Sequence, residues 1–301
     1  MKNGINYYES IKKLLIKDEI YSEVKDNSKE RHRVETYFKT GKLLSEAGKE
    51  YGKDIIGNYA DKLMVEVKKK FNKSTLFKIR KFYKVFSNEK VAPLVPQLSW
   101  SHCLLLIPKK NINEINYYIN QVYINNLSKR DLEIIIRNKQ YERLPDETKN
   151  KLISKEDISL IDSIKNPIII KSNNEELDNI KEFTLKNLII EDIPGFMKEL
   201  GTGFSFIDSE YKIKVDNKYN YIDLLLYNIK YRCYVVVELK VTELKKEHTG
   251  QIMTYMNYID ENIKSINEND TVGIIICKQN NEYVIKHCSD ERIISREFEL
   301  V

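Results

Sequence analysis

The chain has 301 residues, of which 42% are hydrophobic and 32% are charged, and this balance predicts a globular protein long enough for two domains. No apolar run approaches the roughly 20 residues that span a bilayer, and the first residues lack the apolar segment of a signal peptide. The four cysteines are scattered without a CxxC pair, which argues against a zinc ribbon or a disulfide framework. We therefore expect a cytoplasmic protein with reduced thiols and no membrane partner.

Charge is distributed unevenly along the chain. Residues 1–150 carry 30 Lys and Arg against 19 Asp and Glu, a balance of +11, whereas residues 151–301 carry 20 against 26, a balance of −6. A basic half beside an acidic half is typical of a nucleic-acid-binding part joined to a second function. The acidic half is also where a divalent cation site is expected.

Hydrophobic residues recur at helical spacing throughout the N-terminal half. No alternating pattern of a strand appears there, so we expect an all-helical domain over residues 1–150. The expected helices cover residues 5–25, 30–50, 54–71, 75–86, 99–106, 113–126 and 128–136.

A basic segment stands out within this half. Residues 68–90 hold nine Lys or Arg and a single acid, and a break at residues 72–74 precedes a helix for which Ser74 is the predicted N-cap. Helix, three-residue turn and basic helix form the outline of a helix-turn-helix, although a solvated lysine face on an ordinary bundle is the alternative. The residues expected to contact nucleic acid are Lys73, Ser74, Lys78, Arg80, Lys81 and Lys84.

The C-terminal half has a different pattern. Residues 151–174 are polar and interrupted, which predicts a linker, although the apolar run at residues 168–170 is suited to docking against the rest of the chain. Residues 175–301 then predict an α+β domain that begins with a helix. Its expected strands cover residues 204–207, 211–215, 219–227, 232–239, 271–277 and 293–298, with a long helix over residues 243–262.

Three charged residues interrupt or end the apolar strands of this domain. Asp223 lies within one strand, and Glu238 and Lys240 end the next. Because strand side chains alternate, Glu238 and Lys240 share a face, and fourteen intervening residues allow a hairpin to bring Asp223 near Glu238. Two carboxylates suit Mg²⁺, which acidifies a bound water, and a lysine can offset charge on a phosphate. The alternative is that Asp223 caps a turn and Glu238 pairs with Lys240 on a solvent edge.

This pattern resembles a known nuclease signature. Asp223 followed by Glu238-Leu239-Lys240 is similar to the D…(D/E)xK motif of the PD-(D/E)XK superfamily, with Ile222 where the superfamily name has proline. Gln251 and Tyr255 match the QxxxY element of RecB-like members. Over roughly residues 25–301 the chain resembles the YhcG-like PDDEXK nuclease domain proteins. The stretches that carry this resemblance are residues 74–86, 98–102, 199–204, 221–225 and 250–251.

The resemblance implies a fold and a set of site residues. The fold is a two-domain α+β arrangement, in which a helical, winged-helix-like N-terminal domain precedes a restriction-endonuclease-like αβββαβ core with a mixed sheet. Asp223 and Glu238 are implied as metal ligands and Lys240 as the catalytic lysine. Gln251, Tyr255 and Glu199, an acid placed before the first strand, are implied as supporting residues.

We therefore expect a Mg²⁺-dependent nuclease, with Mn²⁺ as a substitute, that hydrolyses phosphodiester bonds as an endonuclease on double-stranded DNA. A homodimer is expected because helix-turn-helix proteins often dimerise and because one site cuts one strand. One alternative is a non-catalytic protein that binds nucleic acid or a partner through a nuclease fold. Another is an RNA nuclease, ranked lower because the sequence shows no interleaved aromatic and basic platform for stacking single strands.

Overall fold

A computed structural model describes residues 6–23, 28–52, 54–89, 91, 98–172 and 180–301 of the chain. It consists of two compact units, Met1–Tyr141 and Glu142–Val301, each considered by itself. Within the described ranges no helix is long and apolar enough to cross a membrane. The three cysteines whose side chains are described, Cys103, Cys233 and Cys277, are buried free thiols.

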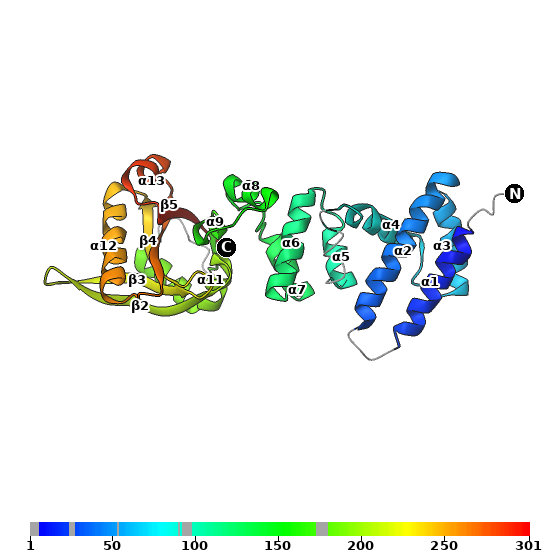
Figure 1. Ribbon diagram of the computed structural model, residues 1–301, viewed down its shortest axis with the longest axis horizontal. Helices are drawn as coiled ribbons and strands as arrows, with labels where there is room; N and C mark the ends of the chain where they lie inside the picture. Colours follow the sequence, from blue (N-terminus) through cyan, green and yellow to red (C-terminus); the bar gives the residue numbers. More distant parts are fainter. Residues whose placement is uncertain (1–5, 24–27, 53, 90, 92–97, 173–179) are drawn as a thin grey trace. The chain divides into compact units, whose positions relative to one another are not determined.

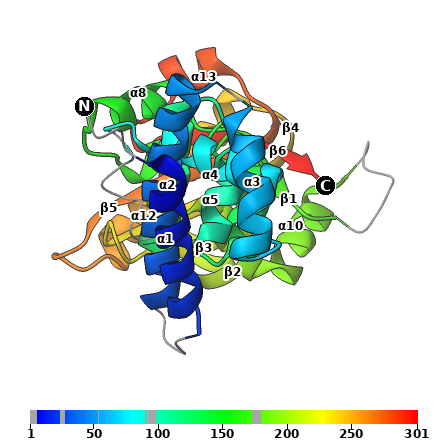
Figure 2. The ribbon, with the colours of Figure 1, turned by 90° about the vertical axis from the view of Figure 1, so that its right-hand side faces the viewer.

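The first unit is helical, which confirms the all-α prediction for the N-terminal half. Its described residues contain no strand, so no wing accompanies the helices there. Helices α1, α2 and α3 lie side by side (Figures 1 and 2). The helices are α1 (Tyr7–Tyr21), α2 (Ser28–Glu50), α3 (Ile55–Glu66), α4 (Lys73–Phe86), α5 (Trp100–Leu106), α6 (Ile112–Asn125) and α7 (Lys129–Arg137).

Helix α4 crosses α2 at Gly41. A Cβ atom at Gly41 would lie 2.5 Å from the carbonyl oxygen of Ile79 and 2.6 Å from the Cβ of Tyr83, so the two backbones approach at a distance that only glycine allows. Trp100, at the start of α5, packs edge-on against Phe82 of α4. The basic helix is thus fixed to the unit along its apolar side.

The second unit is built on one mixed sheet of six strands in the order β1-β6-β5-β4-β3-β2. Strands β2, β3 and β4 pair antiparallel, whereas β4, β5, β6 and β1 pair parallel. The strands are β1 (Ile168–Ile170), β2 (Phe204–Val215), β3 (Lys218–Asn228), β4 (Cys233–Glu243), β5 (Asn269–Gln279) and β6 (Ile293–Leu300).

Helices cover both faces of this sheet. Helices α10 (Glu182–Glu191) and α11 (Ile193–Leu200) pack on one face, and α12 (Lys246–Asn262) packs on the other, next to α13 (Glu282–Cys288). The order α11-β2-β3-β4-α12-β5 confirms the expected αβββαβ core. Alternating strand residues supply the two apolar layers: Leu224, Val237 and Leu239 enter the α10 side, whereas Val236 and Ile275 enter the α12 side.

Residues 151–174, expected as a linker, contain ordered elements of the second unit. Helix α8 (Asp146–Ser154) runs into them, α9 (Leu160–Ser163) follows, and β1 pairs with the sheet edge at β6. The apolar run at residues 168–170 docks, as its composition indicated. The half-buried Arg296 of β6 holds the segment by donating hydrogen bonds to the carbonyls of Ile164 and Ile161, at 3.0 and 3.4 Å. Residues 173–174 lie outside the described residues.

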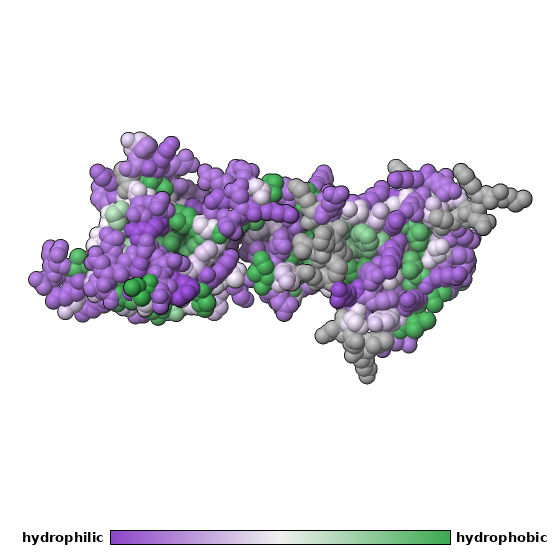
Figure 3. All heavy atoms as spheres, in the orientation of Figure 1, coloured by the Kyte–Doolittle hydropathy of each residue, from purple (hydrophilic) through white to green (hydrophobic). Residues whose placement is uncertain are grey.

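Strands β2 and β3 form a long hairpin that extends beyond the end of α12 (Figure 1). The sequence predicted two strands over residues 204–215, but one strand runs through, with a register shift between Phe206 and Asp208. Asp216 and Asn217, with φ of 47° and 60°, form the two-residue turn. The projecting end is largely hydrophilic on the face seen in Figure 3.

Candidate active site

Backbone pairing between β3 and β4 ends at the position of Asp223. The two strands pair from Asn228 and Cys233 as far as Leu224 and Val237, and no further. One residue beyond, the Oδ2 atom of Asp223 accepts a hydrogen bond from the backbone N–H of Leu239 at 2.9 Å. The carboxylate therefore replaces a strand contact at the point where β3 and β4 separate.

Glu238 and Lys240 point to the α12 side of β4, as strand alternation predicted, while Leu239 enters the opposite apolar layer. The Nζ atom of Lys240 lies 3.3 Å from Oε2 of Glu238. The Glu238 residue is only 1% exposed, and its Oε1 atom is buried with no hydrogen-bond partner. An unsatisfied buried carboxylate oxygen is costly, so this atom needs a proton or a cation.

The electrostatics of the three residues are coupled. Burial and, after it, the nearby Asp223 carboxylate raise the pKa of Glu238 to about 8, although Lys240 acts to lower it. Burial also raises the pKa of Asp223, against the Leu239 N–H and Lys240, which lower it. Burial by itself would lower the pKa of Lys240, but the surrounding acids, Glu238 foremost, raise it above its ordinary value. Lys240 is therefore held as a cation between acids.

A further acid, which the sequence did not single out, belongs to this group. Glu182 opens α10, and its Oε2 atom lies 3.7 Å from Nζ of Lys240. One turn later, Lys186 forms an ion pair with Glu210 of β2 and acts on the Asp223 carboxylate. The sequence predicted an acid in the helix before the first strand, but two helices, α10 and α11, precede that strand, and the acid beside Lys240 lies in the first of them.

Glu199, the acid predicted from the second of these helices, does not join the site. It forms a buried ion pair with Arg143 and accepts a hydrogen bond from the Ile169 N–H of β1 at 3.1 Å. These contacts tie α11 to the β1 edge of the sheet. The prediction of Glu199 as a supporting active-site residue is corrected, because helix α11 presents it to β1 and not to β3 and β4.

Helix α12 brings Gln251 and Tyr255 to the same region. The Nε2 atom of Gln251 donates a hydrogen bond to the Tyr255 hydroxyl at 3.0 Å. Burial raises the pKa of Tyr255, and the charges of Glu238, Lys240 and Asp223 all act on it. His248, in the first turn, accepts the Lys245 N–H through Nδ1 at 3.1 Å, so it serves as a capping residue.

The donor set fits a divalent cation held by few protein ligands. Among the residues that the structure describes, no group of three His, Cys, Asp or Glu converges as a complete metal shell. Mg²⁺ is commonly held by one or two carboxylates while it keeps water and substrate oxygens. Asp223 and Glu238 match that pattern, and the unpartnered Oε1 of Glu238 is an oxygen that a cation would satisfy.

The basic residues predicted to contact nucleic acid lie on α4 of the first unit. The exposed residues among them are Lys73, Ser74, Lys78, Lys81 and Lys84, and Arg80 is half-buried, its guanidinium 5.0 Å from the centroid of the Phe77 ring. Ser74 is not the N-cap: Asn72 precedes the helix and accepts the Thr75 N–H at 3.0 Å. The connection between α3 and α4 covers residues 67–72, longer than the predicted three-residue turn.

Two protein-family models match the chain. Residues 162–296 match the YhcG PDDEXK nuclease domain, and residues 16–143 match the DUF1016 N-terminal domain. A curated protein of Escherichia coli (strain K12), "Putative nuclease YhcG", is 25% identical over 269 residues, covering 78% of this chain and 72% of that protein. The first match contains every residue of the candidate active site.

Two solved structures resemble part of the chain. A repair endonuclease from Pyrococcus abyssi is 22% identical, with a TM-score of 0.29, and the match covers 42% of this chain and 49% of that one. A structure entitled "Structure of EndoMS-dsDNA2 complex" is 18% identical, with a TM-score of 0.31, and the match covers 43% and 48%. This chain thus spans about half the length of each solved chain.

Proposed function

Because residues 16–143 match the DUF1016 N-terminal domain and residues 162–296 match the YhcG PDDEXK nuclease domain, we propose that the chain is a Mg²⁺-dependent endonuclease that hydrolyses phosphodiester bonds in DNA. The observation that carries the proposal is the grouping of Asp223, Glu238 and Lys240 where β3 and β4 separate. Their residue types are those that phosphodiester hydrolysis requires. Mn²⁺, which also accepts carboxylate oxygens, is proposed as a substitute.

Each side chain has a part in the proposed reaction. Asp223 and Glu238 would hold the cation, which when bound polarises the phosphate and acidifies a water. Lys240 offers a fixed positive charge for the negative charge that develops on phosphate oxygens. The charge of Glu182 helps to hold Lys240 in its protonated form, and the Gln251–Tyr255 pair lines the same region from α12.

Cleavage of plasmid, linear, single-stranded and branched DNA and of RNA, with Mg²⁺, Mn²⁺ or EDTA, tests the proposal. We expect DNA to be cut with Mg²⁺, and Asp223→Ala and Lys240→Ala to lose most of the rate, while Lys286→Ala, an exposed lysine of α13, keeps it. Equal residual cleavage by wild type and both site variants would refute the assignment.

The same panel separates the alternatives. Preferential cutting of RNA would favour an RNA nuclease. Tight binding of nucleic acid without turnover in either metal would favour a non-catalytic protein. Lys240, beside both acids, supports the enzyme, because the three residues together supply two carboxylates for a cation and a positive charge for the phosphate.

We also propose that the exposed lysines of α4 bind double-stranded DNA and that a homodimer cuts its two strands. Exposed Lys78, Lys81 and Lys84 would contact phosphates, so replacing all three with Gln should weaken duplex binding and lower its salt dependence by about 2.7 in slope. The matched control replaces Lys13, Lys17 and Lys42, which are equally exposed on α1 and α2, and removes the same charge. Equal losses of duplex affinity in the two triple variants would indicate only general electrostatic attraction. Light scattering of the full chain measures its molar mass and so tests for the dimer.

A further inference from the structure

We propose that the exposed face of the β2–β3 hairpin binds an unpaired nucleic-acid strand beside the Asp223 site. This inference rests on the proposed nuclease function and specifies how the substrate reaches the site. It predicts that the preferred substrates contain a single-stranded stretch next to the cleaved bond, as flaps, forks and frayed ends do.

The hairpin places lysines opposite tyrosines. In the register of the two strands, Lys212 faces Tyr221 and Lys214 faces Tyr219. Tyr221 is 53% exposed and Tyr219 is 59% exposed, and both lysines are exposed as well. The Nζ atom of Lys212 lies 3.8 Å from the centroid of the Tyr219 ring, so a positive charge and an aromatic face are adjacent. Cross-strand pairing therefore sets a row of two lysines on β2 beside a row of two tyrosines on β3, here called the ribbon platform (Lys212, Lys214, Tyr219 and Tyr221).

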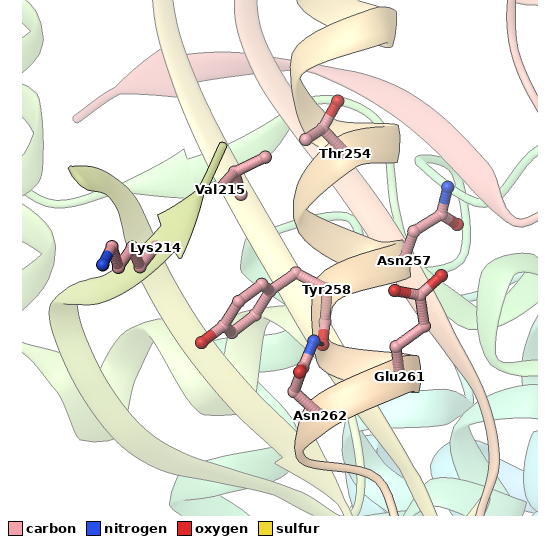
Figure 4. A pocket seen from close by; sticks show the side chains of 7 residues that line it. All are labelled: Lys214, Val215, Thr254, Asn257, Tyr258, Glu261 and Asn262. Carbon is pink, nitrogen blue, oxygen red and sulfur yellow. Dashed lines mark hydrogen bonds between the residues drawn. The ribbon is translucent and has the colours of Figure 1, made fainter. Parts of the chain in front are cut away.

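The opposite face of the hairpin packs against the core. Ile213 and Ile222, which alternate with the platform residues, are buried under α12. Figure 4 shows the same division at the end of β2, where Val215 lies toward α12 and Lys214 points away from it. The hollow drawn there, which Thr254 and Tyr258 of α12 also line, lies between the hairpin and the helix. The platform is thus the face of the hairpin that the unit leaves uncovered.

The platform precedes the site along β3. Tyr221 and Tyr219 lie two and four residues before Asp223, about 7 and 13 Å along the strand. The alternation of side chains breaks at Asp223, because Ile222 packs on the α12 side whereas Leu224 packs on the α10 side. Phe183, next to Glu182 at the start of α10, is 66% exposed. Lys186 lies 5.8 Å from the centroid of the Phe183 ring and pairs with Glu210 of β2, which places this aromatic ring near the base of the hairpin.

The chemistry of this surface matches an unpaired strand. Exposed aromatic rings stack on bases, and this requires base faces that a duplex keeps covered by its own stacking. The lysines on the neighbouring strand neutralise the phosphates that join those bases. Among the described residues, neither Tyr221 nor Lys214 has a hydrogen bond or ion pair within the chain, so both are available to a ligand.

Binding of a fluorescent single-stranded DNA by the full chain, measured by anisotropy in EDTA so that no cutting occurs, tests the proposal. We expect Tyr219→Ala and Tyr221→Ala each to weaken binding by about fivefold or more, and Tyr221→Phe, which keeps the ring, to restore it. The double change Lys212→Gln and Lys214→Gln should lower the salt slope by about 1.4. Tyr283→Ala, at a tyrosine that is 71% exposed on α13, is the matched control. Circular dichroism establishes that each variant is folded.

The outcomes are distinguishable from those of the nuclease assay. Unchanged single-strand affinity in both tyrosine variants overturns the platform while leaving the nuclease proposal intact. Equal losses for a blunt duplex and for the single strand overturn the preference for an unpaired strand. Loss of single-strand binding alone supports the platform, even if wild type proves unable to cut, since the binding assay contains no metal.

Discussion

The carboxylate of Asp223 accepts the backbone N–H of Leu239 at 2.9 Å, at the point where β3 and β4 cease to pair. The same side chain is thus a structural link between the strands and a proposed metal ligand. The contact aligns Asp223 with the β4 segment that carries Glu238 and Lys240. The two roles can be separated by substitution, because an amide oxygen accepts the hydrogen bond but does not supply the charge.

Asp223→Asn should therefore abolish cleavage without weakening the fold. We expect a rate loss of about a thousandfold, since several kcal/mol of metal-dependent stabilisation would be lost. Asp223→Ala should lose the rate equally and also lower the free energy of unfolding by about 1–2 kcal/mol, because the Leu239 N–H loses its partner. Cleavage rates and urea titrations of both variants measure the difference, and an active Asn variant would contradict the metal role.

Glu182 and Glu199 offer a matched pair of acids with opposite expectations. Glu182→Gln should reduce the cleavage rate by about tenfold and leave stability nearly unchanged, because Glu182 is exposed and acts on Lys240. Glu199→Gln should lower the unfolding free energy by about 2–4 kcal/mol, because it breaks a buried ion pair with Arg143. The cleavage rate per folded molecule of the Glu199→Gln variant should stay close to that of wild type. A reversed result would reinstate Glu199 as the site residue.

The raised pKa of Glu238, about 8, predicts a pH dependence of the metal-free protein. Between the ordinary pKa near 4.5 and 8, the folded state binds more protons at Glu238 than the unfolded state, so stability should fall as pH rises through this window. Glu238→Gln should remove this component. Compared with metal-free wild type, the free energy of unfolding of the variant should therefore increase by about 1–3 kcal/mol between pH 5 and pH 8. Thermal unfolding in EDTA across that range measures it.

Metal should reverse this trend in the wild type. Binding requires the ionised carboxylate, so the apparent Mg²⁺ affinity should increase as pH rises toward 8, and calorimetry should detect proton release. The Glu238→Gln variant should show neither effect. A Mg²⁺ affinity independent of pH between 6 and 8 would contradict the assignment of Glu238 as a ligand.

The Gln251–Tyr255 hydrogen bond predicts a smaller contribution to the cleavage rate. Tyr255→Phe removes the hydroxyl that Gln251 contacts but preserves the buried ring, so the fold should be retained. We expect a rate loss of about 10- to 100-fold, the range found when a group that supports a metal site is removed. Thr254→Val on the exposed side of α12 is the control. Wild-type rates in Tyr255→Phe would assign the pair to packing.

Two glycines of the first unit should respond in opposite directions. Gly41→Ala should lower the unfolding free energy by about 1–2 kcal/mol, because the added methyl meets the Ile79 carbonyl and this overpacking exceeds the gain in helix propensity. Gly57→Ala in α3 meets nothing closer than 3.7 Å and should raise stability by about 0.5–1 kcal/mol. Denaturant titrations of the two variants report the sign of each change.

Local patterns were sufficient for most of the secondary structure. Ser99 and Ser128 cap α5 and α7, and in each case the side chain three residues later completes a capping box. Asp216 and Asn217 form the hairpin turn because both residue types tolerate positive φ. Ser74 was mistaken for a cap because Asn72, two residues earlier, has the same capability.

Position in space required the tertiary structure. Glu182 and Glu199 are both acids on helices that precede β2, and the sequence offers no means of choosing between them. The packing of α10 against β4 places one at Lys240, and the packing of α11 beside β1 places the other at Arg143.

The ribbon platform illustrates the same limit. Its lysines lie on β2 and its tyrosines on β3, so they become neighbours only when the two strands pair.

By itself the sequence indicated a helical half, a half that mixes strands with helices, and the charged residues Asp223, Glu238 and Lys240 on its strands. These depend on residue type and on spacing within a strand or hairpin, which are local properties. Only the tertiary structure decided which distant acid joins that group and which hairpin face stays open, because both depend on how helices pack on the sheet.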